Sequence, residues 1–573
     1  MIHKRKYFWR YTMLAIAAVG IMIYLLAPVF GWMLDAVSPR GNALYPTPET
    51  QLIGRVELGQ QPSGALPPPL RQYALDLSHL AGWSDDELPV GDLATNLPAM
   101  VTLRTWSGGS RSYDDNPLLD IKEGRYDDLF QRFLGALPDG GAGVFLRFNP
   151  EMEVPVEAYP WQQYPSVYIE AYRHFAALCD SLAPQAVRVW APAGYPGALE
   201  YYPGDDVVDA ASVTFRYAGE QELSAYPRDL PAEEELYRRL HRLRFLAVPI
   251  YVIHEGDAGG PLPDLTGVVE KLRAAPQGTY GGLRSLDEVE THRRPHRQVA
   301  FTFGLYDPQG RLLGAESISA EHLFVDFRSV QDGSFDSLMQ AVRARGHTPI
   351  VSFEPFHAPD DIRDKDVLAN VAAGRYDKEL QRLYRTLGAA ADRVYFRYAH
   401  EMEIPIHRYP WQSQDPHTYI RSFRYVMDPG KLPANVNRVW GPAGDRGSLE
   451  WYPGDDYVDY LSIAIYGLPD KNITDPRKQE QFATVFNRKM WRMRFVDKPV
   501  FITEFGVKGP EDYQTEWLLG AARTLRGDDR VVGINYFNMS DTPKAWGDIK
   551  PPDWSITRAT LDAFVEELTG AGK

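Results

Sequence analysis

The sequence of 573 residues contains a single cysteine, Cys179. One thiol cannot form an intramolecular disulfide or a thiolate zinc site, so a packed core residue is expected at this position. The histidines and acidic residues lack the spacing of metal ligands, and no phosphate-binding glycine loop is present. We therefore expect neither a metal nor a cofactor.

The chain also lacks an excess of basic residues, since its formal net charge is −15. A nucleic-acid partner is therefore not expected, because such partners are bound by positive surfaces. Aromatic residues make up 12% of the chain. They suit stacking against sugar rings and suit a large core equally well, so composition alone leaves both interpretations open.

One long uncharged hydrophobic run is present, MLAIAAVGIMIYLLAPVFGWML over residues 13–34. At ~1.5 Å per residue it can cross a hydrocarbon core of ~30 Å. A basic stub over residues 1–12 precedes it, which predicts a single-pass anchor in a bacterial inner membrane with the body in the periplasm. A cleaved signal peptide is the alternative, although its apolar region would be shorter and a small-residue cleavage site should follow.

Two stretches that are 250 residues apart are closely similar in sequence. Residues 147–161 are RFNPEMEVPVEAYPW, and residues 397–411 are RYAHEMEIPIHRYPW. The same offset relates the YPGDD motifs at residues 202–206 and 452–456. A period this long indicates a duplicated domain, because solenoid repeats run ~20–50 residues. Features kept in both copies are expected to serve the fold, and features kept in one are candidates for chemistry.

The duplication and the local composition define the expected domain boundaries. Residues 35–65 are rich in proline, glycine and polar residues and predict a tether. A charged segment without an apolar face predicts a second linker between the copies. The expected order is a cytoplasmic stub (1–12), an anchor (13–34), a linker (35–65), a first domain (66–290), a linker (291–297) and a second domain (298–573).

Within each copy, short apolar runs alternate with helical patterns. In the second copy the expected strands are 323–327, 349–353, 394–398, 436–440, 460–465, 499–503 and 531–537, and helices are expected over 376–387 and 419–427. Such alternation over ~250 residues predicts parallel sheets. The expected fold class is α/β, with two tandem (β/α)₈ TIM barrels preceded by one transmembrane helix.

Two glutamates follow expected strands of the second copy. Glu401 comes after the strand at 394–398, and Glu504 comes after the strand at 499–503, so both are expected at the C-terminal rim of a barrel. A glycosidase uses two carboxyl groups, one to protonate the leaving oxygen and one to attack the anomeric carbon or activate water. The acid needs a raised pKa, and Arg397 and His400 are placed to tune the pair. The plain alternative is that glutamates often follow strands because loops are polar.

The motifs around these glutamates are the ordered set GRYDKEL, VYFRYAHEM, YPW, RVWGPAG, YPGDDYVDYLSIAIYG and KPVFITEFG. This set resembles glycoside hydrolase family 26, which contains β-mannanases and related endo-β-glycanases on a (β/α)₈ fold of a retaining clan. The resemblance covers most of the second copy and, more weakly, the first. It implies that Glu401 is the acid/base and Glu504 the nucleophile. The implied substrate-binding residues are His400, Trp411, Trp440, Tyr466 and Arg397.

One loop departs from the family pattern. Family mannanases usually have His-Glu-Met-Asn-Gly, whereas Glu403 replaces the asparagine here and Ile404-Pro405-Ile406 follows. This loop is expected to border the subsite near the scissile bond, which puts mannan in doubt as the substrate. The first copy shares the altered loop.

Three site positions differ in the first copy. The 250-residue offset replaces His400, Glu504 and Tyr466 with Pro150, His254 and Arg216. Glu151 is retained, whereas Glu255 lies one residue late, and a one-residue slip near a strand end re-aims a side chain. We therefore expect a degenerate site formed by Glu151, His254 and Glu255. A slipped active site built on Glu255 is the alternative.

Together these features predict a membrane-anchored, periplasm-facing retaining endo-β-glycosidase. Its expected partners are a β-linked polysaccharide, the membrane, and machinery for polysaccharide synthesis or export, with exopolysaccharide trimming as the expected role. Two alternatives remain open on the sequence. One is a non-catalytic glycan-binding protein of an exopolysaccharide assembly system, and the other is a transglycosylase.

Overall fold

The computed structural model describes much of the chain between residues 42 and 570. The described ranges are 42–66, 70–79, 81, 93, 97–105, 116–138, 143–155, 159–215, 230–255, 262–292, 301–356, 364–389, 393–405, 408–467, 480–541 and 550–570. The predicted anchor over residues 13–34 lies outside these ranges. In the described part of the chain, no helix is long and apolar enough to cross a bilayer.

The chain divides into two compact units. The first comprises Met1–Glu57, Gly64–Arg239 and Val248–Thr266, and the second comprises Leu58–Ser63, Leu240–Ala247 and Gly267–Lys573. The two copies of the sequence repeat therefore fold largely as separate bodies, in the manner of domains with their own cores.

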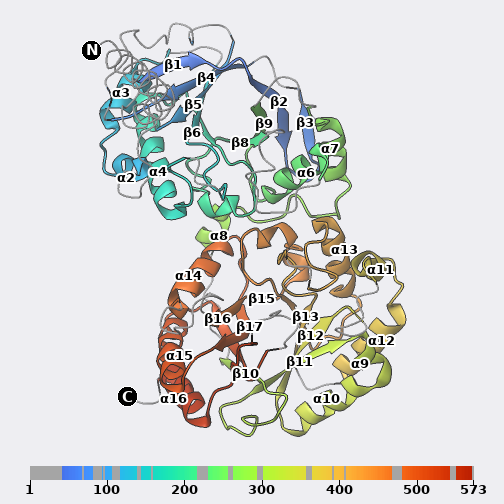
Figure 1. Cartoon of the computed structure of the whole chain (residues 1–573). Coiled ribbons are helices and arrows are strands. Elements are labelled where there is room, and N and C mark those ends of the chain that lie inside the picture. Colours follow the sequence, from blue (N-terminus) through green and yellow to red (C-terminus); the bar gives the residue numbers. More distant parts are fainter. Residues whose placement is uncertain are drawn as a thin grey trace, which may run out of the picture. The chain divides into compact units, whose positions relative to one another are not determined.

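The strands of the second copy form a closed parallel barrel (Figure 1). They are β10 (Thr302–Tyr306), β11 (Ala320–Asp326), β12 (Thr348–Glu354), β13 (Val394–Tyr398), β14 (Val436–Trp440), β15 (Tyr460–Leu461), β16 (Ala464–Gly467), β17 (Val500–Val507) and β18 (Val531–Phe537). Neighbouring strands run in the order β15-β14-β13-β12-β11-β10-β18-β17-β16, and a β15–β17 pairing closes the ring. Because β15 and β16 both pair with β17, they occupy one position, and the barrel has eight strand positions.

Helices accompany these strands. They are α9 (Phe327–Asp332), α10 (Ser334–Ala344), α11 (Val367–Ala372), α12 (Asp377–Gly388), α13 (Pro416–Val426), α14 (Phe482–Arg492), α15 (Glu511–Arg526) and α16 (Arg558–Thr569). Local sequence explains their ends and faces. The carboxylate of Asp415 caps α13 by accepting from the Thr418 amide at 2.8 Å. In α12, Leu380, Leu383 and Leu387 recur at helical spacing and are buried.

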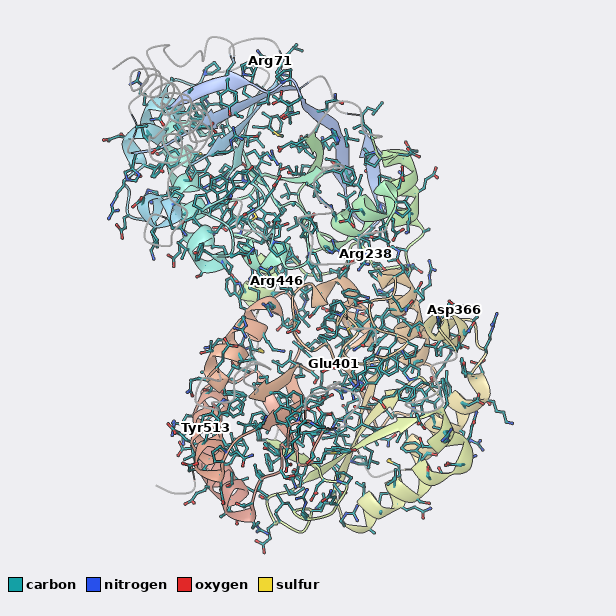
Figure 2. The ribbon with its side chains drawn as sticks, viewed as in Figure 1. Arg71, Arg238, Asp366, Glu401, Arg446 and Tyr513 are labelled. Atoms are coloured by element: carbon teal, nitrogen blue, oxygen red, sulfur yellow. The ribbon has the colours of Figure 1, made fainter. Side chains whose placement is uncertain are left out.

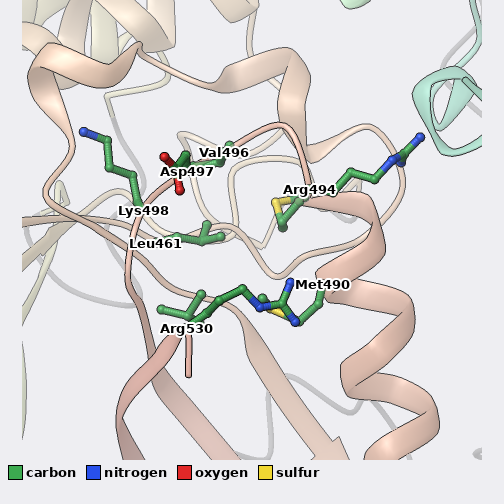
Figure 3. Close-up of a pocket in the computed structure, with 9 residues that line it drawn as sticks. Leu461, Met490, Arg494, Val496, Asp497, Lys498 and Arg530 are labelled. Atoms are coloured by element: carbon green, nitrogen blue, oxygen red, sulfur yellow. The ribbon is translucent and has the colours of Figure 1, made fainter. Parts of the chain in front are cut away.

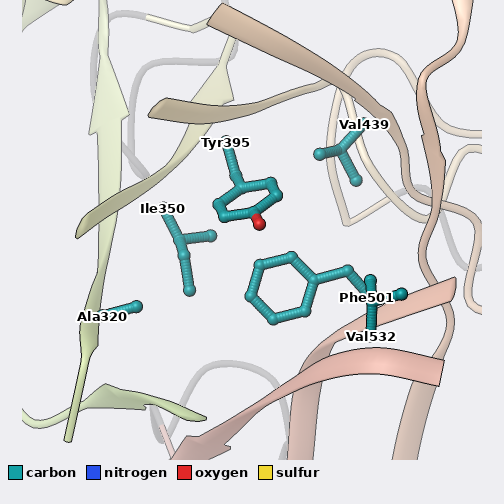
Figure 4. Close-up of a cluster of buried hydrophobic side chains, with 6 residues drawn as sticks. All are labelled: Ala320, Ile350, Tyr395, Val439, Phe501 and Val532. Atoms are coloured by element: carbon teal, nitrogen blue, oxygen red, sulfur yellow. The ribbon is translucent and has the colours of Figure 1, made fainter. Parts of the chain in front are cut away.

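A cluster of buried apolar side chains lies among the strands of this barrel (Figure 4). The cluster consists of Ala320, Ile350, Tyr395, Val439, Phe501 and Val532, which come from six different strands. The rings of Tyr395 and Phe501 meet edge to face with centroids 4.5 Å apart. Side chains of a strand alternate between its two faces, so the residues two and four positions further along β12 share the inward face of Ile350. Those residues are Ser352 and Glu354.

The sheet of the first copy has a different make-up. Its strands are β1 (Ala43–Pro46), β2 (Thr50–Glu57), β3 (Ser63–Ala65), β4 (Arg71–Asp76), β5 (Ala99–Arg104), β6 (Val144–Phe148), β7 (Val187–Trp190), β8 (Ala210–Phe215) and β9 (Ile250–Glu255). Strands β4 to β9 are parallel, whereas β1 runs antiparallel to β4 and β2 runs antiparallel to β9. The expected second eight-stranded parallel barrel is therefore not shown in the described residues.

The helices of the first copy follow the repeat only in part. They are α2 (Pro117–Lys122), α3 (Asp127–Gly135), α4 (Pro165–Leu182), α6 (Ala232–Arg242), α7 (Leu265–Arg273) and α8 (Leu286–His292). Subtracting 250 from the range of β18 gives 281–287, where the structure has no strand and α8 begins. The copy thus lacks the last strand of its counterpart.

Strands within residues 43–57 pair with both edges of the parallel part of this sheet instead. The first of them, β1, pairs with β4, and the second, β2, pairs with β9. Edge strands carry unpaired amides and carbonyls, and covering them satisfies these groups. This part of the segment 35–65, which the sequence predicted to be a linker, belongs to the sheet.

Both copies have left-handed backbone conformations after the strand that precedes Glu151 or Glu401. Ala399, Glu401 and Ser413 have φ angles of 45°, 52° and 52°. The positions exactly 250 residues earlier, which are Asn149, Glu151 and Gln163, have φ angles of 37°, 62° and 71°. Non-glycine residues rarely adopt this left-handed region, and such strain often accompanies a functional site. The shared strain shows that the duplication preserved the local geometry around Glu151 and Glu401.

Candidate active site

The two predicted carboxyl groups lie at the C-terminal rim of the second barrel. Glu504 belongs to β17, and Glu401 follows the end of β13 by three residues. The amide of Glu401 donates to the carbonyl oxygen of Gly441 at 2.9 Å, which ties the glutamate to the segment after β14. Glu401 is labelled in Figure 2. Its left-handed backbone and this hydrogen bond together fix the direction of its side chain.

Glu504 is held by two hydrogen bonds. Arg397 Nη2 lies 2.5 Å from Oε1, and the hydroxyl of Tyr466 donates to Oε2 at 3.0 Å. Burial by itself raises the pKa of Glu504, but the charge of Arg397 and both hydrogen bonds outweigh it, and the net pKa is lowered. The group is therefore an oriented carboxylate at neutral pH, as a nucleophile requires.

Glu401 has the opposite electrostatic environment. Burial, followed by the negative charge of Glu504, raises the pKa of Glu401 to about 8. The group therefore holds a proton near neutral pH. Two neighbouring carboxyl groups with pKa values driven apart are the arrangement by which an enzyme assigns one group as acid and the other as nucleophile.

A chain of buried hydrogen bonds positions Arg397. Its Nε donates to Ser352 Oγ at 2.7 Å, and His322 Nε2 lies 2.7 Å from the same oxygen. Asn535 Nδ2 lies 3.1 Å from His322 Nδ1 and donates to the Thr503 carbonyl at 3.0 Å. Burial lowers the pKa of His322 well below its usual value, so this imidazole is neutral and adds no charge beside Arg397. The sequence had not indicated Ser352, His322 or Asn535.

His400 lies between two carboxyl groups. Its Nε2 is 3.9 Å from Oε1 of Glu504 and 3.9 Å from Oε1 of Glu354. Burial, together with the charges of Arg397 and Arg408, lowers the pKa of His400 well below its usual value. The ring is therefore neutral and does not act as a cation that would neutralise Glu504.

The sequence had missed Glu354, the last residue of β12. Burial, followed by the charge of Glu504, raises its pKa to about 8. The signal available in the sequence was its position, because Glu354 ends a strand as Glu401 and Glu504 nearly do. The rim of the barrel thus carries a third carboxyl group.

The two predicted cleft tryptophans are buried. Trp411 and Trp440 both have 0% exposure. Trp411 stacks on Tyr409 with centroids 4.5 Å apart and donates through Nε1 to the His400 carbonyl at 2.7 Å. Trp440 meets Tyr452 edge to face at 5.0 Å. Neither ring offers a surface to a sugar in this structure, and Trp411 instead supports the backbone that precedes Glu401.

Half-buried aromatic rings are present at the ends of other strands. Tyr306 of β10 lies 5.0 Å from Phe324 of β11 and 4.8 Å from Phe537 of β18 between ring centroids. Phe324 in turn lies 5.8 Å from the ring of His400. We call Tyr306, Phe324 and Phe537 the aromatic platform. Sequence analysis did not identify it, because β10 was not among the expected strands.

The altered loop has a structural role. Oε1 of Glu403 accepts from the amide of Gly444 at 3.0 Å, the amide of Asp445 at 3.3 Å and Oγ of Ser448 at 2.7 Å. Its counterpart Glu153 accepts from the two corresponding amides in the first copy. Glu403 is 4% exposed, so it anchors a neighbouring loop instead of facing a subsite, and its presence does not argue against mannan.

The first copy keeps part of the arrangement. Arg147 Nη1 lies 2.6 Å from Oε1 of Glu255, so the slipped glutamate still reaches the guanidinium group that corresponds to Arg397. His254, at the position of Glu504, is 2% exposed, and Glu151 is 3% exposed. Arg216 lies outside the described residues. The copy therefore retains an arginine–glutamate pair but replaces the nucleophile position with a buried histidine.

Other groups in the described part of the chain do not add to this site. Cys179 is buried in α4, and burial raises the pKa of its thiol to about 12, which keeps it protonated. Among the described residues, no group of three or more His, Cys, Asp or Glu is arranged to hold a metal ion. The small pocket in Figure 3 includes Lys498 and Arg530, which precede β17 and β18, so it lies at the opposite end of these strands from Glu504.

Comparisons with known proteins give partial matches. No protein-family model matches the chain. A beta-1,3-xylanase (TXYA) of Vibrio sp is 29% identical over 171 residues, which are 28% of this chain and 33% of that protein. Endoglucanase H of Acetivibrio thermocellus is 25% identical over 249 residues, which are 40% of this chain and 25% of that protein. The chain thus spans about a third or less of the length of these curated relatives.

Among solved structures, a GH26 beta-mannanase from Bacteroides ovatus aligns with 49% of this chain and 91% of its own, at 17% identity and a TM-score of 0.35. An endo-beta-1,4-mannanase of Cellulomonas fimi aligns with 49% of this chain and 72% of its own, at 17% identity and a TM-score of 0.33. By its sequence matches the chain is related to glycoside hydrolases, as the resemblance of its motifs to family 26 predicted.

Proposed function

We propose that the second barrel is a retaining endo-β-glycosidase that acts on a β-linked polysaccharide. The observation that carries the proposal is the contrast between two neighbouring carboxyl groups. Glu504 is fixed by Arg397 and Tyr466 with a lowered pKa, and Glu401 has a pKa raised to about 8. This assignment gives each group the charge that a retaining mechanism requires.

In the first step, the Glu504 carboxylate attacks the anomeric carbon and the bond from that carbon to the leaving oxygen breaks. Glu401 gives its proton to the leaving oxygen, so a covalent glycosyl-enzyme ester and a free chain end are formed. In the second step, Glu401 accepts a proton from water as the water attacks the same carbon. The ester bond to Glu504 breaks, and both carboxyl groups return to their starting states. Retention requires the two carboxyl groups to be ~5–5.5 Å apart.

The alternative of a purely glycan-binding protein explains less of the site. Binding needs no carboxylate oriented by two donors beside a second carboxyl group that holds a proton. A transglycosylase would use the same residues with a sugar hydroxyl in place of water, so the two activities differ only in the acceptor. The presence of oligosaccharides longer than the substrate among the products would reveal the transfer activity.

We further propose that residues 13–34 anchor the chain in a bacterial inner membrane with the barrels in the periplasm. The support is the length of the uncharged run and its basic flank. In this setting the enzyme would trim an exopolysaccharide close to where it is made or exported. A reporter that is active only in the periplasm, fused to the C-terminus, tests the orientation. Sequencing of the mature N-terminus tests whether the segment is cleaved.

The experiment for the activity uses the full-length protein in detergent. Release of reducing ends is measured with β-1,3-xylan, β-1,4-mannan, β-glucans and the exopolysaccharide of the source organism. We expect oligosaccharide products of mixed length from at least one polymer, and no release by Glu504→Gln. If the wild-type protein cleaves none of them while still binding one, the glycan-binding alternative replaces this proposal.

A further inference from the structure

Glu354 has the geometry of a substrate contact. Glu354 shares the inward face of β12 with Ile350 and Ser352. It comes two residues after Ser352, whose hydroxyl oxygen accepts a hydrogen bond from Arg397. Its side chain is 13% exposed, and its carboxyl group makes no hydrogen bond with the described part of the chain. A mostly buried polar group of this kind normally has a partner. Nε2 of His400 lies 3.9 Å from its Oε1.

The internal comparison links Glu354 to the active copy. The position 250 residues earlier is Arg104, which ends β5 as Glu354 ends β12. Arg104 fills its own site by pairing with Asp76 at 2.7 Å and by donating to the hydroxyl of Tyr45. The copy without the nucleophile therefore closes this position with an internal ion pair. In the second copy, the carboxyl group of Glu354 makes no corresponding ion pair with an arginine in the described part of the chain.

The surroundings of Glu354 are those of a sugar subsite. Tyr306, Phe324 and Phe537 form a partly exposed apolar surface on β10, β11 and β18, and β11 pairs directly with β12 as far as Glu354. The first copy has Val56, Ala74 and Asp287 at the three corresponding positions. A flat ring beside a hydrogen-bonding carboxyl group is the usual composition of a site that orients a small polar ligand. Both parts of the subsite are thus confined to the second copy.

Glu354 and Glu401 come from neighbouring strands, because β12 ends at Glu354 and pairs directly with β13, which Glu401 follows. The charge of Glu504 raises the pKa of both glutamates, and the charge of Arg397 lowers both. Arg408 also acts on Glu354, whereas Glu403 and Lys489 act on Glu401. Glu354 therefore lies at the same rim as the two carboxyl groups of the proposed mechanism.

We propose that Glu354 is a substrate-binding residue that hydrogen-bonds the hydroxyl groups of a sugar ring that rests against the aromatic platform. The inference rests on the proposed function of the second barrel and deepens it. A protonated carboxyl group offers one donor and one acceptor, which matches a pair of adjacent sugar hydroxyls. The raised pKa of Glu354 agrees with this form near neutral pH.

The test uses Glu354→Ala, Glu354→Gln and Glu354→Arg in the full-length protein, where the last variant copies the first domain. We measure kcat and KM on the polymer that the wild-type enzyme cleaves best. Dissociation constants for the tetrasaccharides of β-1,3-xylan, β-1,4-mannan and cellulose are measured calorimetrically in the Glu504→Gln background. The matched control is Glu516→Ala on the exposed face of α15. Thermal melts show whether each variant is folded.

Loss of a hydrogen bond of ordinary strength predicts that Glu354→Ala weakens tetrasaccharide binding about 3- to 10-fold. Glu354→Gln keeps a donor and an acceptor and is expected to weaken binding less, whereas Glu354→Arg should weaken it most. Unchanged KM and dissociation constants in folded Glu354→Ala and Glu354→Gln, with an active wild type, would overturn this inference and leave the proposed function standing. A wild-type protein that neither cleaves nor binds any of these glycans would overturn both.

Discussion

The guanidinium group of Arg397 lies 2.5 Å from the carboxylate of Glu504, and this contact has a counterpart in the other copy. Arg147 lies 2.6 Å from Glu255, although Glu255 is one position later than the offset requires. The duplication therefore kept an arginine that holds a carboxylate, while the carboxylate itself moved along its strand. The same anchoring pair can thus serve a reacting group in one copy and a structural contact in the other.

Tyr466 is expected to control both the position and the charge of Glu504. Its hydroxyl donates to Oε2 at 3.0 Å, and this bond lowers the pKa of Glu504. A hydrogen bond to a charged group is worth about 1.5–3 kcal/mol, so Tyr466→Phe should lower kcat about 10- to 100-fold. Because the lost bond had lowered the pKa, the acidic limb of the rate profile should move to higher pH. A profile of kcat/KM against pH for both proteins measures the shift, and an unmoved acidic limb would contradict this role.

The pH dependence of turnover should have a basic limb set by Glu401. The enzyme requires Glu401 protonated and Glu504 ionised. With the pKa of Glu401 at about 8, kcat/KM should fall as the pH rises through that value. In Glu401→Gln, aryl glycosides with good leaving groups should still be turned over to the glycosyl-enzyme, without that limb. If the basic limb persists in Glu401→Gln, it belongs to another ionisable group. The variant Glu354→Gln then shows whether that group is Glu354.

Stability should decrease as the pH rises from weakly acidic values to about 8. The pKa values of Glu354 and Glu401 are raised to about 8 and that of Glu153 to about 7, from 4.5. The native state therefore binds more protons than the unfolded state up to these values, and the free energy of unfolding falls as the pH rises. The lowered pKa values of His322 and His400 act in the opposite direction only near and below their usual 6.5.

The melting temperature should accordingly drop between about pH 6.5 and about pH 8, where the native glutamates still hold protons that the unfolded state has lost and the histidines no longer oppose them. The double variant Glu354→Gln, Glu401→Gln removes two of the glutamates whose pKa is raised and should flatten the drop. Differential scanning calorimetry of the two proteins across this range provides the comparison. A steeper drop in the double variant would show that the sign of the effect is wrong.

Sequence patterns predicted much of the second barrel. The expected strands 394–398, 436–440 and 531–537 coincide with β13, β14 and β18, because their buried runs are bounded by polar or turn residues. Strand β10 was missed, since its five residues TFGLY contain a glycine and follow the expected linker. The constant 250-residue offset implied the same fold for the first copy. That offset carries no information on which strands pair. The antiparallel pairing of β1 and β2 came only from the structure.

The sequence identified the site residues that belong to recognisable motifs. It missed the residues that only their contacts in the structure reveal. Glu401, Glu504, Arg397, His400 and Tyr466 meet at one rim, as their positions at strand ends implied. Trp411 and Trp440 were expected in the cleft from the resemblance to family 26, but a matching motif cannot distinguish a ring that faces a cleft from a buried ring. Glu354 is a lone glutamate before a proline, and its position at a strand end was its one signal in the sequence until the structure showed its proximity to His400.

The central claim is that Glu504, and no group of the first copy, forms the covalent bond to the substrate. The most direct test is inactivation of the full-length protein by aryl fluoroglycosides of xylose, mannose and glucose oligomers, followed by mass spectrometry of the labelled peptides. The account predicts one sugar per chain, attached to Glu504, with labelling abolished in Glu504→Gln and retained in the matched variant Glu255→Gln. A label on Glu255, or labelling that survives Glu504→Gln, would contradict it and place the active site elsewhere.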